Sequence, residues 1–289
     1  MENLERQLIE GLIDRLEELR ETGARFAPIR AETLRDLARP PRPTPAPASE
    51  APPPPAGPPV ATQKQPSLLN STRSAPPPED KEKALEALRK DVLACRKCPH
   101  LAAARRHVVF GVGNPRSPLL FVGEAPGVDE DRQGEPFVGR AGQLLTKIIE
   151  AMGLTRSDVY IANILKCRPD TPGRASGNRK PTPAEMITCL PWLLEQIRIL
   201  QPQVIVALGA TAVEGLLGKQ AAGRGITRLR GNWLEFEGVP LMPTYHPAYL
   251  LRNPTLQEKR KVWEDMLQVM ERLGLPISEK QRNYFLKRP

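Results

Sequence analysis

The sequence predicts an α/β fold: a three-layer α/β/α sandwich with a central, mostly parallel, four-stranded sheet. Two observations predict this class. From about residue 119 onward, short apolar runs alternate with longer segments whose apolar residues have helical spacing. The runs are continuously apolar, which is typical of parallel strands covered by helices on both faces. Because ligands of such sheets bind at the carboxyl ends of the strands, we expect the functional residues there.

The composition divides the chain into four parts. Residues 1–39 carry leucines and isoleucines at helical spacing with charged residues opposite, so we expect an amphipathic helical segment that docks to a partner. Residues 40–78 are rich in Pro and Ala and contain little that could form a core, which predicts a disordered linker. We expect the folded domain at 79–275 and a basic C-terminal tail at 276–289.

Within the domain, the expected elements follow one another in order. A helix-like segment at 79–94 leads to a pair of cysteines, and the apolar run 119–122 ends at Gly123. Helical spacing over 141–152 is closed by Gly153. The remaining expected elements are strands at 159–165, 204–208 and 239–242 and helices at 182–200, 211–217 and 256–273. Helices between successive strands predict a parallel sheet.

The charge balance and the apolar content restrict the partners. Lys and Arg total 42 against 33 Asp and Glu, which gives a net charge of +9 and a pI near 9.6 and suits a polyanionic partner. No stretch approaches the roughly 20 apolar residues that a membrane helix needs, and the N-terminus MENLERQLIEGL lacks the pattern of a signal peptide. We therefore expect a cytoplasmic, nucleoid-associated monomer with no membrane partner.

The chain contains four cysteines. Cys95 and Cys98 form a C-x-x-C pair, whereas Cys167 follows an expected strand and Cys189 falls in an expected helix. In a reducing compartment such cysteines indicate metal or cluster ligands rather than disulfides. Four thiolates suit a zinc ion or a [4Fe–4S] cluster, and buried free thiols are the remaining alternative. The spacing alone does not separate the three.

Several short blocks lie at or near the expected strand ends: GEAPG at 123–127, DED at 129–131, PFVGRAG at 136–142, NILKCRP at 163–169 and HPAYLLR at 246–252. In this order, interleaved with the cysteines, they resemble the family 4 uracil-DNA glycosylases over about residues 88–274. The resemblance implies an enzyme that flips uracil out of DNA and hydrolyses its N-glycosidic bond, leaving an abasic site. It also implies that the four cysteines hold a [4Fe–4S] cluster.

The resemblance and the chemistry together assign roles to the residues of these blocks. A glycosylase must read the flipped base by its hydrogen-bonding edge and stack on it. We expect Phe137 to stack on the base and the Asn163 amide to pair with uracil N3–H and O4, which cytosine presents in reverse. His246 matches the histidine that stabilises the departing uracil anion, and backbone N–H groups around Ala125 and Gly127 supply further donors.

Carboxylates and basic residues complete the expected site. Glu124 and Glu130 are the candidates for positioning or deprotonating the attacking water and for shaping the pocket near uracil C5, and the sequence does not say which does which. Loops rich in Gly, Pro and basic residues supply the expected contacts to the DNA backbone, from Arg179, Lys180 and Arg252.

Two features depart from the family pattern. Residues 170–176, between the third and fourth cysteines, look like an insertion relative to the family pattern. Residues 1–78 lie outside the catalytic blocks. We expect the N-terminal helix to tether the enzyme to a replication or repair protein. The loop 168–188 contains no histidine, which favours hydrolytic turnover over the covalent trapping of related superfamily members. The rival hypotheses are a catalytically silent DNA- or polymerase-associated module of the same fold and a zinc-stabilised nucleotide-binding protein.

Overall fold

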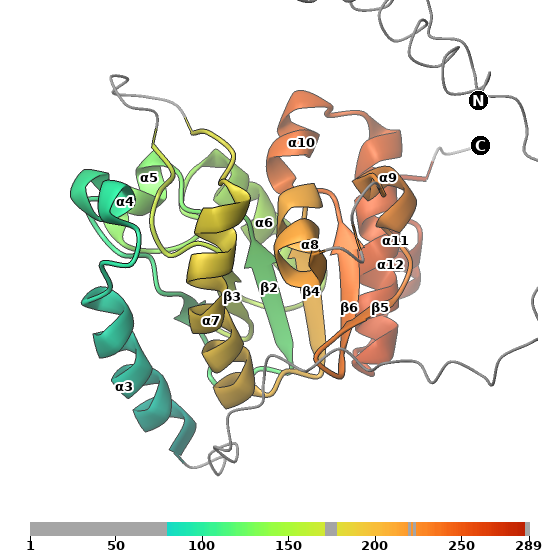
Figure 1. Ribbon diagram of the computed structural model, residues 1–289. Helices are drawn as coiled ribbons and strands as arrows, with labels where there is room; N and C mark the ends of the chain where they lie inside the picture. The colour runs from blue at the N-terminus through green and yellow to red at the C-terminus, as the bar shows by residue number, and fades with distance from the viewer. Residues whose placement is uncertain (1–79, 171–177, 219–220, 222–223, 287–289) are drawn as a thin grey trace, which may run out of the picture. The chain divides into compact units, whose positions relative to one another are not determined.

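The structure, a computed structural model, describes residues 80–170, 178–218, 221 and 224–286 (Figure 1). The helical segment and the linker predicted for 1–39 and 40–78 lie outside the described residues, and so does most of the predicted insertion at 170–176. None of the described helices is long and apolar enough to cross a membrane.

A six-stranded sheet with strand order β1-β3-β2-β4-β6-β5 forms the centre of the domain (Figure 1). Its four inner strands are parallel and are those that the apolar runs predict: β2 (Leu119–Gly123), β3 (Tyr160–Asn163), β4 (Val204–Leu208) and β6 (Val239–Thr244). Two antiparallel edge strands are additional to the prediction, β1 (Val112–Gly113) and β5 (Leu234–Phe236). With two and three residues, these strands are too short to leave a pattern in the sequence.

Helices cover both faces of this sheet, so the predicted three-layer α/β/α sandwich is confirmed (Figure 1). Along β2, Leu120 and Val122 face one layer, whereas Leu119 and Phe121 face the other, as the pleat of a strand requires. The described helices are α3 (Lys81–Leu93), α4 (Pro99–Ala104), α5 (Val128–Gln133), α6 (Arg140–Ala151), α7 (Pro183–Leu200), α8 (Ala210–Leu217), α9 (Ile226–Leu229), α10 (Pro247–Arg252), α11 (Leu256–Arg272) and α12 (Glu279–Arg282). Helices α3, α7 and α8 pack on the first face, and α6 and α11 pack on the second.

Helix α7 begins with a strong local signal. The Thr182 hydroxyl accepts from the Glu185 N–H, and the Glu185 carboxylate accepts from the Thr182 N–H, which together form a capping box. Pro183 occupies the first turn, where its missing N–H costs nothing. This start fixes the register of the helix and therefore the direction in which Cys189 points.

The segment predicted as a basic tail carries α12 and packs on the domain. The Trp263 indole N–H donates to Gln281 O at 2.6 Å, and the Gln281 amide donates to Ala151 O at 2.9 Å. The Tyr284 ring lies 5.2 Å from the Trp263 ring between centroids. The folded domain therefore extends past residue 275, and its last apolar side chains reach the core from a stretch that reads as basic.

Candidate active site

The carboxyl ends of the parallel strands bring three of the predicted site residues together. Asn163 ends β3 and pairs in register with Gly123, the last residue of β2. A Cβ atom at Gly123 would lie 2.4 Å from Asn163 Oδ1 and 2.5 Å from Phe137 Cζ. Glycine is therefore needed at this position, because both side chains occupy the space in front of the strand end.

The Asn163 side chain is buried without a partner for its amide oxygen. The residue is 2% exposed, and Asn163 Oδ1 has no hydrogen-bond donor in the part of the chain that the structure describes. A buried acceptor left unpaired costs about 1–3 kcal/mol, so native proteins rarely keep one without a reason. The oxygen is available for a donor that comes from a ligand.

Phe137 adopts a backbone conformation that aromatic residues rarely have. Its φ is +54°, in the left-handed region, which costs on the order of 1–3 kcal/mol. Arg156 donates to the Phe137 carbonyl at 3.1 Å and to the Pro136 carbonyl at 2.8 Å and so holds this turn. A Cβ at Gly142 would lie 1.8 Å from the same Phe137 oxygen, so α6 approaches closely only because residue 142 is glycine. The turn brings the Phe137 ring to 5.7 Å from the His246 ring.

His246 is held as a neutral imidazole with a defined tautomer. It caps α10, where His246 Nδ1 accepts from the Ala248 N–H at 3.1 Å. An accepting Nδ1 carries no proton, so the proton of the neutral ring lies on Nε2. Burial, together with the nearby Arg252 cation, lowers the pKa of His246 to about 4. At neutral pH the ring therefore presents an uncharged Nε2–H donor beside Phe137.

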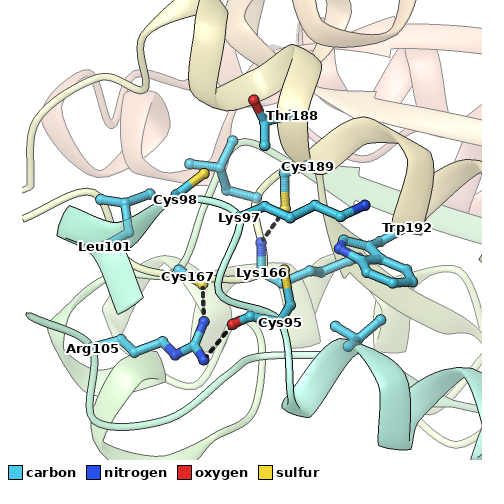
Figure 2. A pocket seen from close by; sticks show the side chains of 12 residues that line it. Cys95, Lys97, Cys98, Leu101, Arg105, Lys166, Cys167, Thr188, Cys189 and Trp192 are labelled. Carbon is cyan, nitrogen blue, oxygen red and sulfur yellow. Dashed lines mark hydrogen bonds between the residues drawn. The ribbon is translucent and has the colours of Figure 1, made fainter. Parts of the chain in front are cut away.

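The four cysteines line one cavity, although they come from three separate segments of the chain (Figure 2). Cys95 and Cys98 lie between α3 and α4, Cys167 follows β3, and Cys189 lies within α7. Arg105 Nη1 donates to Cys167 Sγ at 3.0 Å, and the Lys166 backbone N–H donates to Cys189 Sγ at 3.3 Å. Among the described residues, no three His, Cys, Asp or Glu side chains lie close enough together to hold a single metal ion.

Comparisons with known proteins give a consistent answer. A sequence model of the uracil DNA glycosylase superfamily matches residues 110–267. The chain is 46% identical to the type-4 uracil-DNA glycosylase of Thermotoga maritima over 64% of this chain and 93% of that protein. It is 39% identical to the type-4 enzyme of Sulfurisphaera tokodaii over 70% of this chain and 90% of that protein. For the type-4 enzyme of Archaeoglobus fulgidus the identity is 41%, over 61% and 87% of the two chains.

The chain belongs to the type-4 uracil-DNA glycosylases. The family resemblance that the five blocks predict is thereby confirmed. The superfamily match begins just before β1, at residue 110, and ends within α11, at residue 267.

The two candidate glutamates differ in what they touch. Glu130 accepts from the Gly127 N–H at 3.1 Å and from the Val138 and Gly139 N–H groups at 3.0 and 2.9 Å. Its carboxylate thus joins the loop after β2 to the loop that carries Phe137, and it occupies the Gly127 donor. Glu124 is half-buried, and its carboxylate has no hydrogen bond to any described residue. The Ala125 N–H is likewise unpaired among the described residues.

The predicted DNA-backbone contacts also differ. The Arg179 guanidinium is paired with the buried Glu185 carboxylate at 2.5 and 2.8 Å, so it organises the start of α7. Lys180 pairs with Glu214 on the surface at 2.8 Å, a kind of contact worth little in water. Arg252 is exposed at the end of α10. Lys180 and Arg252 are therefore better placed for phosphates than Arg179.

Four residues with contacts at the site are absent from the sequence prediction: Arg105, Arg156, Lys166 and Trp192. Lys166 lies within the NILKCRP block and could have been singled out as a lysine at the end of an apolar strand. Arg105, Arg156 and Trp192 contact segments that are distant in the sequence, and such contacts leave no local pattern from which they could be predicted.

Proposed function

We propose that this chain flips uracil out of DNA and hydrolyses its N-glycosidic bond, leaving an abasic site. The observation that carries the proposal is the buried, unpaired Asn163 oxygen beside the Phe137 ring. A flipped base that stacks on Phe137 would bring its hydrogen-bonding edge to this amide. The family membership of the chain supports the same activity.

Uracil fits the Asn163 amide better than cytosine does. Uracil N3–H would donate to Asn163 Oδ1, and uracil O4 would accept from the amide nitrogen. Cytosine offers an acceptor at N3 and a donor at its amino group, so both contacts would place like groups against each other. A site that hydrogen-bonds its ligand in this way rejects the wrong partner strongly, because buried polar groups are then left unpaired.

His246 supplies the donor for bond cleavage. When the N-glycosidic bond breaks, its electron pair leaves with the base, and negative charge develops on uracil O2. The Nε2–H of neutral His246 would donate to this oxygen, with the Ala125 N–H as a second donor. One such donor is worth about 2.7–4 kcal/mol of transition-state stabilisation.

Glu124 is the carboxylate that we assign to the water. Water attacks the sugar carbon C1′, and its proton passes to the carboxylate while uracil leaves as the anion. Glu124 is suited to this because it follows β2 directly and its carboxylate oxygens are unpaired among the described residues. Glu130 would act as a positioning residue, since its two oxygens already accept three backbone N–H groups.

We further propose that Cys95, Cys98, Cys167 and Cys189 hold a [4Fe–4S] cluster. Four thiolates around one zinc ion would each lie about 2.3 Å from the metal. The four thiols of this chain line a common cavity, and the family resemblance of the surrounding blocks supports the cluster rather than one zinc ion. When bound, the cluster would tie together the segments that carry the cysteines. Burial raises the pKa of the Cys189 thiol to about 11, so this sulfur would lose its proton when the cluster binds.

Lys180 and Arg252 would contact DNA phosphates, and Leu251, which is 37% exposed at the end of α10, would lie beside the flipped nucleotide. Leu250 is buried and is therefore unsuited to that role.

We also propose that the protein acts as a monomer on nucleoid DNA in the cytoplasm. The segment 1–39 would bind a replication or repair protein.

The decisive experiment measures uracil release from a uracil-containing oligonucleotide by alkaline strand scission. The wild-type protein should cleave, and His246→Ala should lose about 10²–10³-fold in kcat. His107→Ala is the matched control, because His107 is exposed and its ring bonds the Asp131 carbonyl of α5, so it should retain activity. Iron-containing protein that releases no uracil would instead support the catalytically silent module.

A further inference from the structure

A third N–H group belongs to a residue in the wall of the cavity lined by the cysteines, and it has no acceptor in the described part of the chain. Two N–H donors already reach cysteine sulfurs, from Arg105 to Cys167 and from the Lys166 backbone to Cys189. The third is Trp192 Nε1, which is buried and has no hydrogen-bond acceptor in the described part of the chain. An unpaired buried N–H costs about 1–3 kcal/mol, so it should find an acceptor when the cavity is filled.

Trp192 is held firmly in the cavity wall. It follows Cys189 by three residues on α7, so that both side chains lie on the same face of the helix. The Lys97 ammonium lies over its ring, 4.5 Å from the centroid. Figure 2 shows the indole nitrogen on the side of the ring that faces the cysteines. The ring is therefore held between α7 and Lys97, while its N–H has no acceptor among the described residues.

Arg105 places a fixed positive charge beside the same cavity. Its Nη1 donates to Cys167 Sγ at 3.0 Å, and its Nη2 donates to Cys95 O at 2.8 Å. The two bonds hold the guanidinium between the C-x-x-C segment and the residue that follows β3. A cation in this position favours any state of a bound group that carries more negative charge.

We propose that Trp192 and Arg105 donate hydrogen bonds to the sulfur atoms of the cluster and its thiolates, and thereby raise its reduction potential and slow its loss in air. The proposal rests on the [4Fe–4S] cluster proposed above. Hydrogen bonds to the sulfurs stabilise the more reduced, more negative form of such a cluster. Groups that contact metal ligands also contribute to the retention of the metal.

The test compares Trp192→Phe with the wild-type protein. Phenylalanine keeps an aromatic ring under Lys97 and removes only the N–H donor. Trp233→Phe is the matched control, because Trp233 stacks with Arg272 on the other side of the sheet and does not line the cavity. Iron and sulfide content, the midpoint potential at an electrode, and the decay of the visible absorbance in air are measured for all three proteins. Arg105→Met is measured as a further variant.

Trp192→Phe should contain the same iron and sulfide as the wild type but have a lower midpoint potential and lose its absorbance faster. Trp233→Phe should match the wild type. Arg105→Met should shift the potential further in the same direction, because both a charge and a hydrogen bond are removed. An unchanged potential and decay rate in Trp192→Phe would overturn the inference while leaving the cluster in place. Wild-type protein without iron and sulfide would overturn the cluster, and uracil release, measured on the same samples, decides separately about the glycosylase activity.

Discussion

At the scale of single residues, the role proposed for His246 depends on the protonation state of its ring. A charged imidazolium would be a stronger donor, but the N–H of Ala248 and the cation of Arg252 both act against a proton on Nδ1. In the proposed mechanism, the neutral ring needs no proton from solvent before each turnover, and it already lies beside the Phe137 ring. The site therefore resembles an oxyanion hole more than a general acid.

This state predicts an unusual titration. Because burial and Arg252 lower the pKa of His246 to about 4, its ring should remain neutral at pH 5, where an ordinary histidine is protonated. The unfolded chain binds this proton near pH 6.5, so the folded state is destabilised as the pH falls from 6.5 toward 4, by up to about 3 kcal/mol. Ring ¹⁵N chemical shifts measured from pH 8 to pH 4.5, with His246→Gln to assign the signals, check this. A midpoint near 6.5 would contradict the neutral-donor mechanism.

At the scale of elements, α7 connects the base pocket to the cysteine cavity. It carries Cys189 near its start and Gln196 two turns later, and Gln196 accepts from Lys166 Nζ at 2.5 Å. The Lys166 side chain is 1% exposed and also donates to Asn163 O at 3.0 Å. Burial lowers the pKa of Lys166 to about 8, so the amine is mostly protonated at neutral pH. One lysine thus joins the carbonyl of Asn163, the residue proposed to read the base, to the helix that carries the fourth cysteine.

Replacing this lysine should affect base reading. Lys166→Met keeps the length of the side chain but leaves Asn163 O and the Gln196 amide oxygen without their donor, at a cost of about 1–3 kcal/mol in stability. We expect kcat/KM for uracil release to fall about tenfold or more. A misplaced Asn163 stabilises the transition state less, and each loss of about 1.4 kcal/mol of this stabilisation lowers the rate tenfold. Lys147→Met, at an exposed position of α6, is the control and should behave as the wild type. Unchanged kcat/KM in Lys166→Met would show that Asn163 is held without it.

At the scale of the whole molecule, the sequence predicts what is local and misses what depends on distant contacts. The strands β2, β3, β4 and β6 could be predicted because buried strands are continuously apolar. The gathering of Asn163, Phe137 and His246 followed from the rule for strand ends together with the family resemblance. The hydrogen bond from Arg156 to the Phe137 carbonyl could not be predicted, because it joins segments that are distant in the sequence. The role of Glu130 was open for the same reason, since three backbone N–H groups decide it.

The C-terminal segment shows this limit most clearly, and it yields a test of stability. Removal of residues 276–289 would take the acceptor from the Trp263 indole, the donor from Ala151 O and the Tyr284 ring from the core. Burial of one such side chain and two hydrogen bonds are together worth about 2–5 kcal/mol, or roughly 5–15 °C in Tm for a domain of this size. Removal of residues 287–289 alone is the control and should leave Tm unchanged. Thermal unfolding followed by circular dichroism measures both, and equal Tm values for the two truncated proteins would mean that α12 does not belong to the folded core.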